Sequence, residues 1–132
     1  MNIRLAEHYG LCFGVRDAIA QAEQLAEGGP LTILGELVHN PVVRDRLARR
    51  GVQEGVLAEP GSAATAQVMI TAHGAADAAR SAWRHAGYGV ADGTCPLVRH
   101  AHEQLRLLVQ LGYQPVVIGK RGHVEEIGRA HV

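Results

Sequence analysis

Short apolar runs alternate with longer amphipathic segments along almost the whole chain, and this alternation restricts its fold most. The runs are bounded by Gly, Pro or Asn, as strands often are, whereas the segments between them repeat apolar residues at helical spacing. Such alternation is typical of parallel strands joined by crossover helices. We therefore predict an α/β fold of parallel-sheet lobes with crossover helices. Strands are predicted at residues 1–6, 31–34, 52–57, 67–71, 88–92 and 114–119, and helices at 15–27, 41–50, the alanine-rich part of 72–87, and 96–112.

Charge and length exclude several classes of protein. The 132 residues suffice for one ordinary domain, and 13 basic residues balance 13 acidic ones, so no net field attracts a polyanion. No apolar run approaches the ~20 residues of a membrane span. The polar N-terminus does not resemble a signal peptide. We expect a cytoplasmic protein that binds neither nucleic acid nor membrane.

Cysteine or histidine recurs in the loops between predicted strands and helices, next to glycine or near a helix start. These residues are Cys12, His39, His73, Cys95 and His123. In open parallel sheets, ligands bind beyond the carboxyl ends of the strands. The five side chains are therefore expected to gather on one edge of the sheet.

The two cysteines have the same local context, which favours a shared role. Cys12 lies between glycines just before a predicted helix, and Cys95 precedes Pro96, a residue suited to the first helical position. A helix N-terminus favours the thiolate. Either cysteine alone is better explained as an inert loop thiol, but the pair indicates a shared metal ion or cluster. A zinc site of two thiols completed by histidines is a further possibility, although the spacing matches no zinc finger.

The loop histidines indicate an anion site. Imidazoles and free backbone N–H groups near helix starts suit phosphate. Each histidine alone is better explained by a hydrogen bond to a neighbouring carbonyl, but the joint pattern weakens that explanation. Glu125 follows His123 by two residues, where a carboxylate can act as a general acid or can simply be solvated. For Thr94, we predict that the hydroxyl caps the helix that follows.

Five motifs, taken in order and spacing, resemble those of the 4-hydroxy-3-methylbut-2-enyl diphosphate reductases, the iron–sulfur family also called LytB. The resemblance extends from Met1 to about Gly128. The motifs are GLCFGVRDAI, ELVHNPVV, ITAHGA, DGTCPLVRHAH and VIGKRGHVEEIG.

The resemblance implies a trefoil of three α/β lobes around a [4Fe–4S] cluster held by three cysteines. This chain would supply the N-terminal part: a first lobe over residues 1–94 and an incomplete second lobe over residues 95–132. Cys12 and Cys95 match the first two cluster ligands, and the third cysteine is absent from this chain.

The resemblance also implies a reaction, the reductive dehydration of 4-hydroxy-3-methylbut-2-enyl diphosphate to isopentenyl and dimethylallyl diphosphate. His39, His73 and His123 match the histidines that bind the diphosphate, and Glu125 matches the glutamate that delivers protons to the departing hydroxyl. Ferredoxin or flavodoxin would donate the electrons, and a C-terminal partner chain or a second copy would complete the site. The alternative function is a non-catalytic phosphate- or zinc-binding α/β domain.

Overall fold

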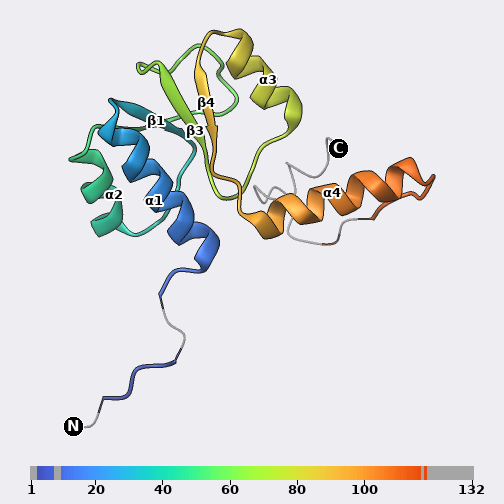
Figure 1. The fold of residues 1–132 in the computed structure, drawn as a ribbon, viewed down its shortest axis with the longest axis horizontal. Helices are drawn as coiled ribbons and strands as arrows, with labels where there is room; N and C mark the ends of the chain where they lie inside the picture. The colour runs from blue at the N-terminus through green and yellow to red at the C-terminus, as the bar shows by residue number, and fades with distance from the viewer. Residues whose placement is uncertain (1–2, 8–9, 117, 119–132) are drawn as a thin grey trace.

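A computed structural model describes residues 3–7, 10–116 and 118 and shows a layered α/β lobe from which one long helix projects (Figure 1). Four helices and four strands make up this part of the chain and alternate except where β3 follows β2, which confirms the predicted fold class. The elements in chain order are α1 (Phe13–Glu27), β1 (Leu31–Leu34), α2 (Pro41–Ala48), β2 (Val52–Gly55), β3 (Gln67–Ile70), α3 (Asp77–His85), β4 (Gly89–Asp92) and α4 (Pro96–Gln110).

All strand pairs are parallel, and the strand order is β2-β1-β3-β4. The chain therefore leaves β1 toward one side of the sheet and leaves β3 toward the other. Neighbouring loops diverge after Leu34 and Ile70, which are register partners at the ends of β1 and β3. Such a switch point is where doubly wound sheets bind ligands.

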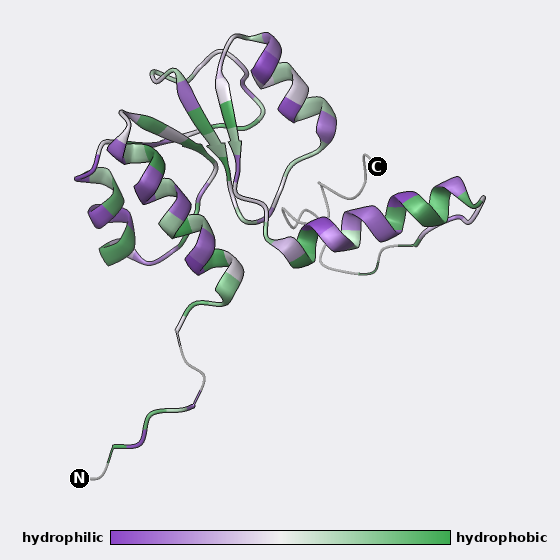
Figure 2. Ribbon diagram, viewed as in Figure 1, coloured by the Kyte–Doolittle hydropathy of each residue, from purple (hydrophilic) through white to green (hydrophobic). Residues whose placement is uncertain are grey.

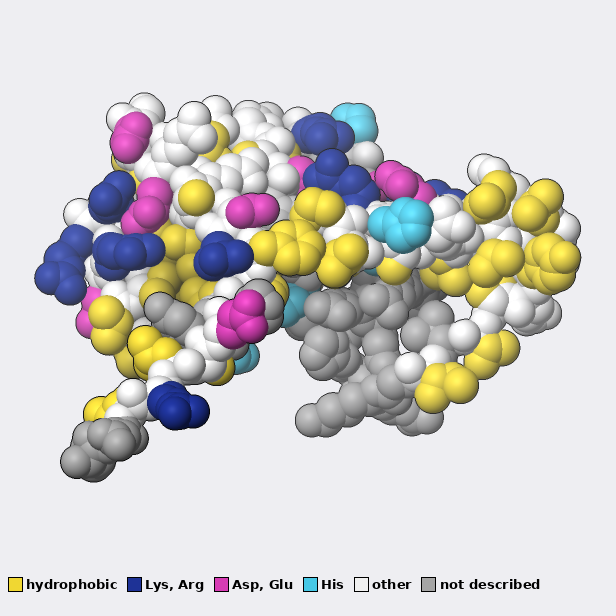
Figure 3. Space-filling view, turned by 60° about the horizontal axis from the view of Figure 1, so that its bottom comes forward, with side chains coloured by type: hydrophobic (Ala, Val, Ile, Leu, Met, Phe, Trp, Pro, Cys, Tyr) yellow, Lys and Arg dark blue, Asp and Glu magenta, His cyan; other side chains and the backbone are white. Residues whose placement is uncertain are grey.

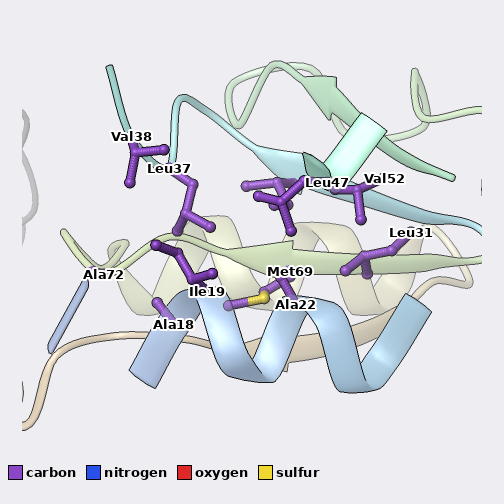
Figure 4. Packing of buried hydrophobic residues seen from close by; sticks show 11 residues of the cluster. Ala18, Ile19, Ala22, Leu31, Leu37, Val38, Leu47, Val52, Met69 and Ala72 are labelled. Atoms are coloured by element: carbon purple, nitrogen blue, oxygen red, sulfur yellow. The ribbon is translucent and has the colours of Figure 1, made fainter. Parts of the chain in front are cut away.

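Helices cover both faces of the sheet, so its two central strands, β1 and β3, are the most deeply buried. One cluster joins α1 and α2 to one face (Figure 4), and a second joins α3 to the other around Trp83. Every residue of β1 is buried, as expected for a central parallel strand. The first cluster contains Ala18, Ile19, Ala22, Leu31, Ile33, Leu37, Val38, Leu47, Val52, Met69 and Ala72.

Trp83 anchors α3 by both packing and a hydrogen bond. Its ring is fully buried and meets Tyr88 edge-on with 4.9 Å between ring centroids. The indole N–H donates to the carbonyl of Leu57 over 2.8 Å, while the Tyr88 hydroxyl donates to the carbonyl of Ala63 over 3.0 Å. These bonds tie α3 and the start of β4 to the loop between β2 and β3.

Replacing Trp83 with phenylalanine should lower the free energy of unfolding by about 1–3 kcal/mol, because the Leu57 carbonyl loses its donor. Chemical denaturation measures the change. The matched control is Tyr88→Phe, which removes a hydrogen bond but little volume and should cost less. A Trp83→Phe protein as stable as the wild-type chain would show that the indole hydrogen bond is unimportant.

Two predicted strands are wrong in the part of the chain that the structure describes. Residues 3–7 form no strand, and neither do residues 114–116 and 118. An isolated strand leaves its backbone groups unpaired, so it needs a neighbour in space. Figure 1 shows the N-terminal segment leading away from the sheet, where it has no such neighbour. The remaining predicted strands agree with β1 to β4 to within two residues at each end.

Helix α4 is amphipathic, but most of its apolar face is exposed. Only Val98 and His102 are buried within it, whereas Leu97 is 65% and Leu111, just past its end, 64% exposed. Figure 2 shows apolar residues along the projecting helix, and Figure 3 shows them gathered over its far end. The exposed apolar residues of α4 and the segment after it, which we call the α4 apolar face, are Leu97, Leu107, Leu108, Val109, Leu111, Tyr113, Val116 and Ile118. Within the described residues, no helix is long and apolar enough to span a membrane.

Candidate functional site at the carboxyl edge of the sheet

The N-termini of α1 and α4 meet at the carboxyl edge of the sheet. Helix α1 leads through a short turn into β1, so it runs opposite to the strands and begins at their carboxyl ends. Helix α4 begins directly after β4, at the same edge. Figure 1 shows these two helix starts next to each other below the strand ends.

Each of the two helices has a cysteine as its N-cap residue. The Cys12 carbonyl accepts from the Arg16 N–H over 3.0 Å, and the Cys95 carbonyl accepts from the Arg99 N–H over 3.0 Å. Neither cysteine side chain makes a capping hydrogen bond. Cys12 is exposed and Cys95 is partly buried, and no disulfide joins them. Both thiols are therefore available as ligands beside the partial positive charge of a helix N-terminus.

Gly14 lets the Cys95 thiol approach the first turn of α1. A Cβ atom built on Gly14 would lie 2.5 Å from Cys95 Sγ and 2.8 Å from Cys95 Cβ, which is closer than atoms can pack. Cys95 therefore lies against the backbone two residues beyond Cys12. The predicted gathering of the two cysteines is thus supported by a direct contact between α1 and the start of α4.

The loop after β3 brings His73 to the cysteine turn. A Cβ on Gly74 would lie 3.0 Å from Thr94 Cγ2 and 3.6 Å from His102 Cε1, and the φ angle of Gly74 is +82°. The Cys95 N–H also donates to the carbonyl of Ala72 over 2.9 Å. The half-buried His73 therefore stands in a loop that touches the residues just before Cys95.

Contrary to the prediction from the sequence, the structure does not bring the side chain of His39 together with the two cysteines. Its side chain is 94% exposed, and its Nδ1 lies 3.0 Å from Glu36 Oε1. The loop that carries it does meet the β3 loop, since a Cβ on Gly35 would lie 3.6 Å from Thr71 Cγ2. His39 and His73 therefore flank the switch point on neighbouring loops, but no contact joins His39 to the cysteines within the described residues.

Asp92, at the end of β4, is a site residue that the sequence did not single out. Its Oδ1 accepts from the Thr94 N–H over 3.0 Å and from the Thr94 hydroxyl. Its Oδ2 lies 3.5 Å from Arg80 Nε and 3.7 Å from Arg99 Nη2. The hydroxyl of Thr94 thus bonds Asp92, and the prediction that it caps α4 is wrong, because Cys95 occupies the N-cap position.

Opposing effects set the pKa of Asp92. Burial raises it, but the hydrogen bonds from Thr94 and the charges of Arg80 and Arg99 outweigh burial, so the pKa lies below its ordinary value of 3.8. A carboxylate with a lowered pKa stabilises the folded state above the unfolded pKa, and this contribution disappears as the pH falls through the folded pKa.

Acidification should therefore remove the stability difference between the wild-type chain and Asp92→Asn. At neutral pH the wild-type chain should be the more stable, and the gap should close as the pH drops below 3.8 toward the lower folded pKa. Chemical denaturation at a series of pH values measures this gap. A gap that keeps its full size through this range would contradict the ion pairs and hydrogen bonds assigned to Asp92.

Two predicted site residues, His123 and Glu125, lie outside the described residues. Within residues 3–7, 10–116 and 118, no group of three His, Cys, Asp or Glu side chains is arranged to hold a metal ion. A zinc site completed by histidines thus lacks a third ligand in this part of the chain. A cluster held by cysteines fits the two thiols at the neighbouring starts of α1 and α4, which provide part of a ligand set.

Comparison with known proteins identifies the family. The family described as LytB protein matches residues 3–131. A 4-hydroxy-3-methylbut-2-enyl diphosphate reductase from Aquifex aeolicus is 38% identical over 97% of this chain and 44% of its own length. A reductase of the same name from Haemophilus ducreyi is 39% identical over 97% of this chain and 41% of its own length. The chain thus spans less than half the length of these curated relatives.

Two solved structures that resemble this chain are also reductases of this kind. A structure of (E)-4-hydroxy-3-methyl-but-2-enyl diphosphate reductase, described as the terminal enzyme of the non-mevalonate pathway, superposes with a TM-score of 0.85 at 35% identity. The superposition includes 98% of this chain and 46% of the chain in that structure. The corresponding reductase from Plasmodium falciparum gives a TM-score of 0.80 at 27% identity, over 92% of this chain and 39% of its own. Since the sequence match extends over nearly all of its residues, the chain belongs to the LytB family.

Proposed function

We propose that this chain is the N-terminal part of a cytoplasmic, iron–sulfur-dependent reductase that acts on 4-hydroxy-3-methylbut-2-enyl diphosphate. The reaction consumes two electrons and two protons, releases the hydroxyl as water, and yields isopentenyl or dimethylallyl diphosphate. The observation that carries the proposal is the meeting of two cysteine-capped helix starts, with Cys95 packed on Gly14. The matching reductases add support.

Cys12 and Cys95 would hold two irons of a [4Fe–4S] cluster. When bound, such a cluster supplies electrons and an open iron that acts as a Lewis acid on the substrate hydroxyl. The two helix N-termini stabilise the thiolates. A third cysteine must come from outside these 132 residues, either from a C-terminal partner chain or from a second copy of this chain.

His39 and His73 would bind the diphosphate, together with His123. Support comes from the topology, because the loops of His39 and His73 flank the switch point of the sheet. The pairing of His39 with Glu36 would have to open for the imidazole to reach a phosphate. Since His39 is at the surface, a rotation about its side chain suffices.

Glu125 would donate a proton to the departing hydroxyl, and a ferredoxin or flavodoxin would supply the electrons. A protonated carboxyl group near the hydroxyl improves the leaving group. The hydroxyl then departs as water, while the second proton and the electron pair go to the carbon skeleton.

Residues 95–132 would begin a second lobe that the chain does not complete. The exposed α4 apolar face supports this assignment, because Leu97 in the helix and Leu111 just past its end are both more than half exposed, and within the described residues few side chains cover this face. Residues 1–94 would form the first lobe. The chain spans less than half the length of its curated relatives, which leaves room in those proteins for the rest of a second lobe.

Joining this chain to the C-terminal part of the Aquifex aeolicus relative tests the proposal. The purified hybrid, reconstituted with iron and sulfide without oxygen, should oxidise a reduced viologen dye when the diphosphate substrate is added. Mass spectrometry should then detect the two isoprenoid diphosphates. The C-terminal part alone and a Cys12→Ser hybrid should both be inactive.

A folded hybrid that retains iron but leaves the substrate unchanged would contradict the proposed reaction. A hybrid that takes up stoichiometric zinc and shows no iron–sulfur absorption would instead favour the non-catalytic zinc- or phosphate-binding domain.

A further inference from the structure

We propose that Asp92 is a positioning residue for Cys95, holding both the turn before this cysteine and the direction of α4. The inference rests on the proposed function, since that function gives Cys95 its role. Asp92 itself begins the turn that leads to Cys95, and it is not one of the proposed cluster ligands. Its two carboxylate oxygens perform separate tasks.

The Oδ1 atom of Asp92 fixes the turn. It accepts hydrogen bonds from both the N–H and the hydroxyl of Thr94. Thr94 is only 5% exposed, so these bonds hold the turn on its buried side. On the other side of Thr94, the Cys95 N–H is held by the carbonyl of Ala72. With Thr94 and the Cys95 N–H both held, the backbone at Cys95 is fixed, and from there its thiol packs against Gly14.

The Oδ2 atom of Asp92 fixes the helix. Arg99 lies in the first turn of α4 and approaches Oδ2 to 3.7 Å, while Arg80 of α3 approaches it to 3.5 Å. Arg80 also donates to Asp77 over 2.7 Å, and Asp77 pairs in turn with Arg106 of α4. The five charges form one chain of alternating sign from α4 to α3 and back.

We infer that this chain of ion pairs sets the direction of α4 relative to the sheet, which in most helices is set by apolar packing. Arg99 and Arg106 are seven residues apart, so they lie on the same side of α4, about two turns from each other. Val98 and His102 are the buried residues of α4, so among the described residues little apolar contact sets the direction of this helix. Because Cys95 is the N-cap of α4, a change in the direction of the helix displaces the thiol.

Two substitutions separate these tasks. Asp92→Asn retains an oxygen for Thr94 but removes the charge that faces Arg80 and Arg99. Thr94→Val retains the shape of the side chain but removes the hydroxyl that Oδ1 accepts. The control is Asp45→Asn, an exposed carboxylate of α2 on a different part of the lobe.

A reagent that cross-links two neighbouring thiols, dibromobimane, tests the inference on the metal-free chain. It should bridge Cys12 and Cys95 in the wild-type chain and in Asp45→Asn. In Asp92→Asn and Thr94→Val, the rate of bridging relative to single labelling should fall about tenfold, the size of effect seen for groups that orient ligands. Circular dichroism should show the same helix content in all four proteins.

Bridging in Asp92→Asn at the wild-type rate would overturn the inference. A wild-type chain that is not bridged would overturn it as well, since the thiols would not be held together. Reconstitution separates this result from the proposed function. If the variants bridge normally but the wild-type chain retains iron, only the role of Asp92 fails, whereas efficient bridging without any iron uptake counts against the cluster.

Discussion

Cys95→Ser should lose its iron after anaerobic reconstitution while keeping its fold. Serine has a similar size but a hydroxyl that binds iron poorly at neutral pH. Changes to residues that merely orient ligands already cost about 10–100-fold in metal affinity, so losing a ligand should cost more than about 100-fold. Iron and sulfide analysis after gel filtration measures the loss.

The fold of Cys95→Ser should be preserved, because its side chain is partly exposed and makes no capping hydrogen bond. The matched control is Thr94→Ser, which keeps a hydroxyl for Asp92 in the same turn and should retain iron. An unchanged iron content in Cys95→Ser would exclude Cys95 as a ligand.

Gly14→Ala should weaken iron binding without destabilising helix α1. In a helix, alanine is more stable than glycine by roughly 0.5–1 kcal/mol, so α1 itself should tolerate the change. The added Cβ, however, would lie 2.5 Å from Cys95 Sγ, and the thiol must move away. We expect the affinity for iron to fall about 10–100-fold, as for other changes that displace a ligand.

A glycine at the other end of the same helix provides the control for Gly14→Ala. A Cβ on Gly28 would meet only the carbonyl of Leu25, at 3.4 Å, and the φ angle of −84° suits alanine. Gly28→Ala should therefore bind iron like the wild-type chain. Equal iron binding by Gly14→Ala and Gly28→Ala would contradict the close approach of Cys95 to α1.

Local signals predicted much of the lobe. Asn40 accepts from the N–H groups of Val42 and Val43, and Pro41 begins α2, as the sequence indicated. The strands β1 and β3 were predicted because each is a short, largely apolar run between turn residues. Both cysteines were placed at helix starts, and the structure has both there.

Features that depend on distant residues were not predictable. Residues 3–6 have the composition of a strand, but pairing requires an adjacent strand, which sequence pattern does not reveal. The role of Asp92 depends on Arg80, which lies on another element and has no fixed spacing from it. The contact of Cys95 with Gly14 joins residues that are far apart in the sequence, so predicting it required the strand order to be known.

The most direct test of the account is to map which cysteines a bound cluster protects. The reconstituted chain is treated with iodoacetamide without oxygen, and mass spectrometry then measures alkylation at Cys12 and Cys95, before and after a chelator removes the iron. Both cysteines should be protected together while iron is bound and should become reactive together on chelation. Alkylation of either cysteine at the same rate with and without bound iron would contradict a cluster shared by the two helix N-termini.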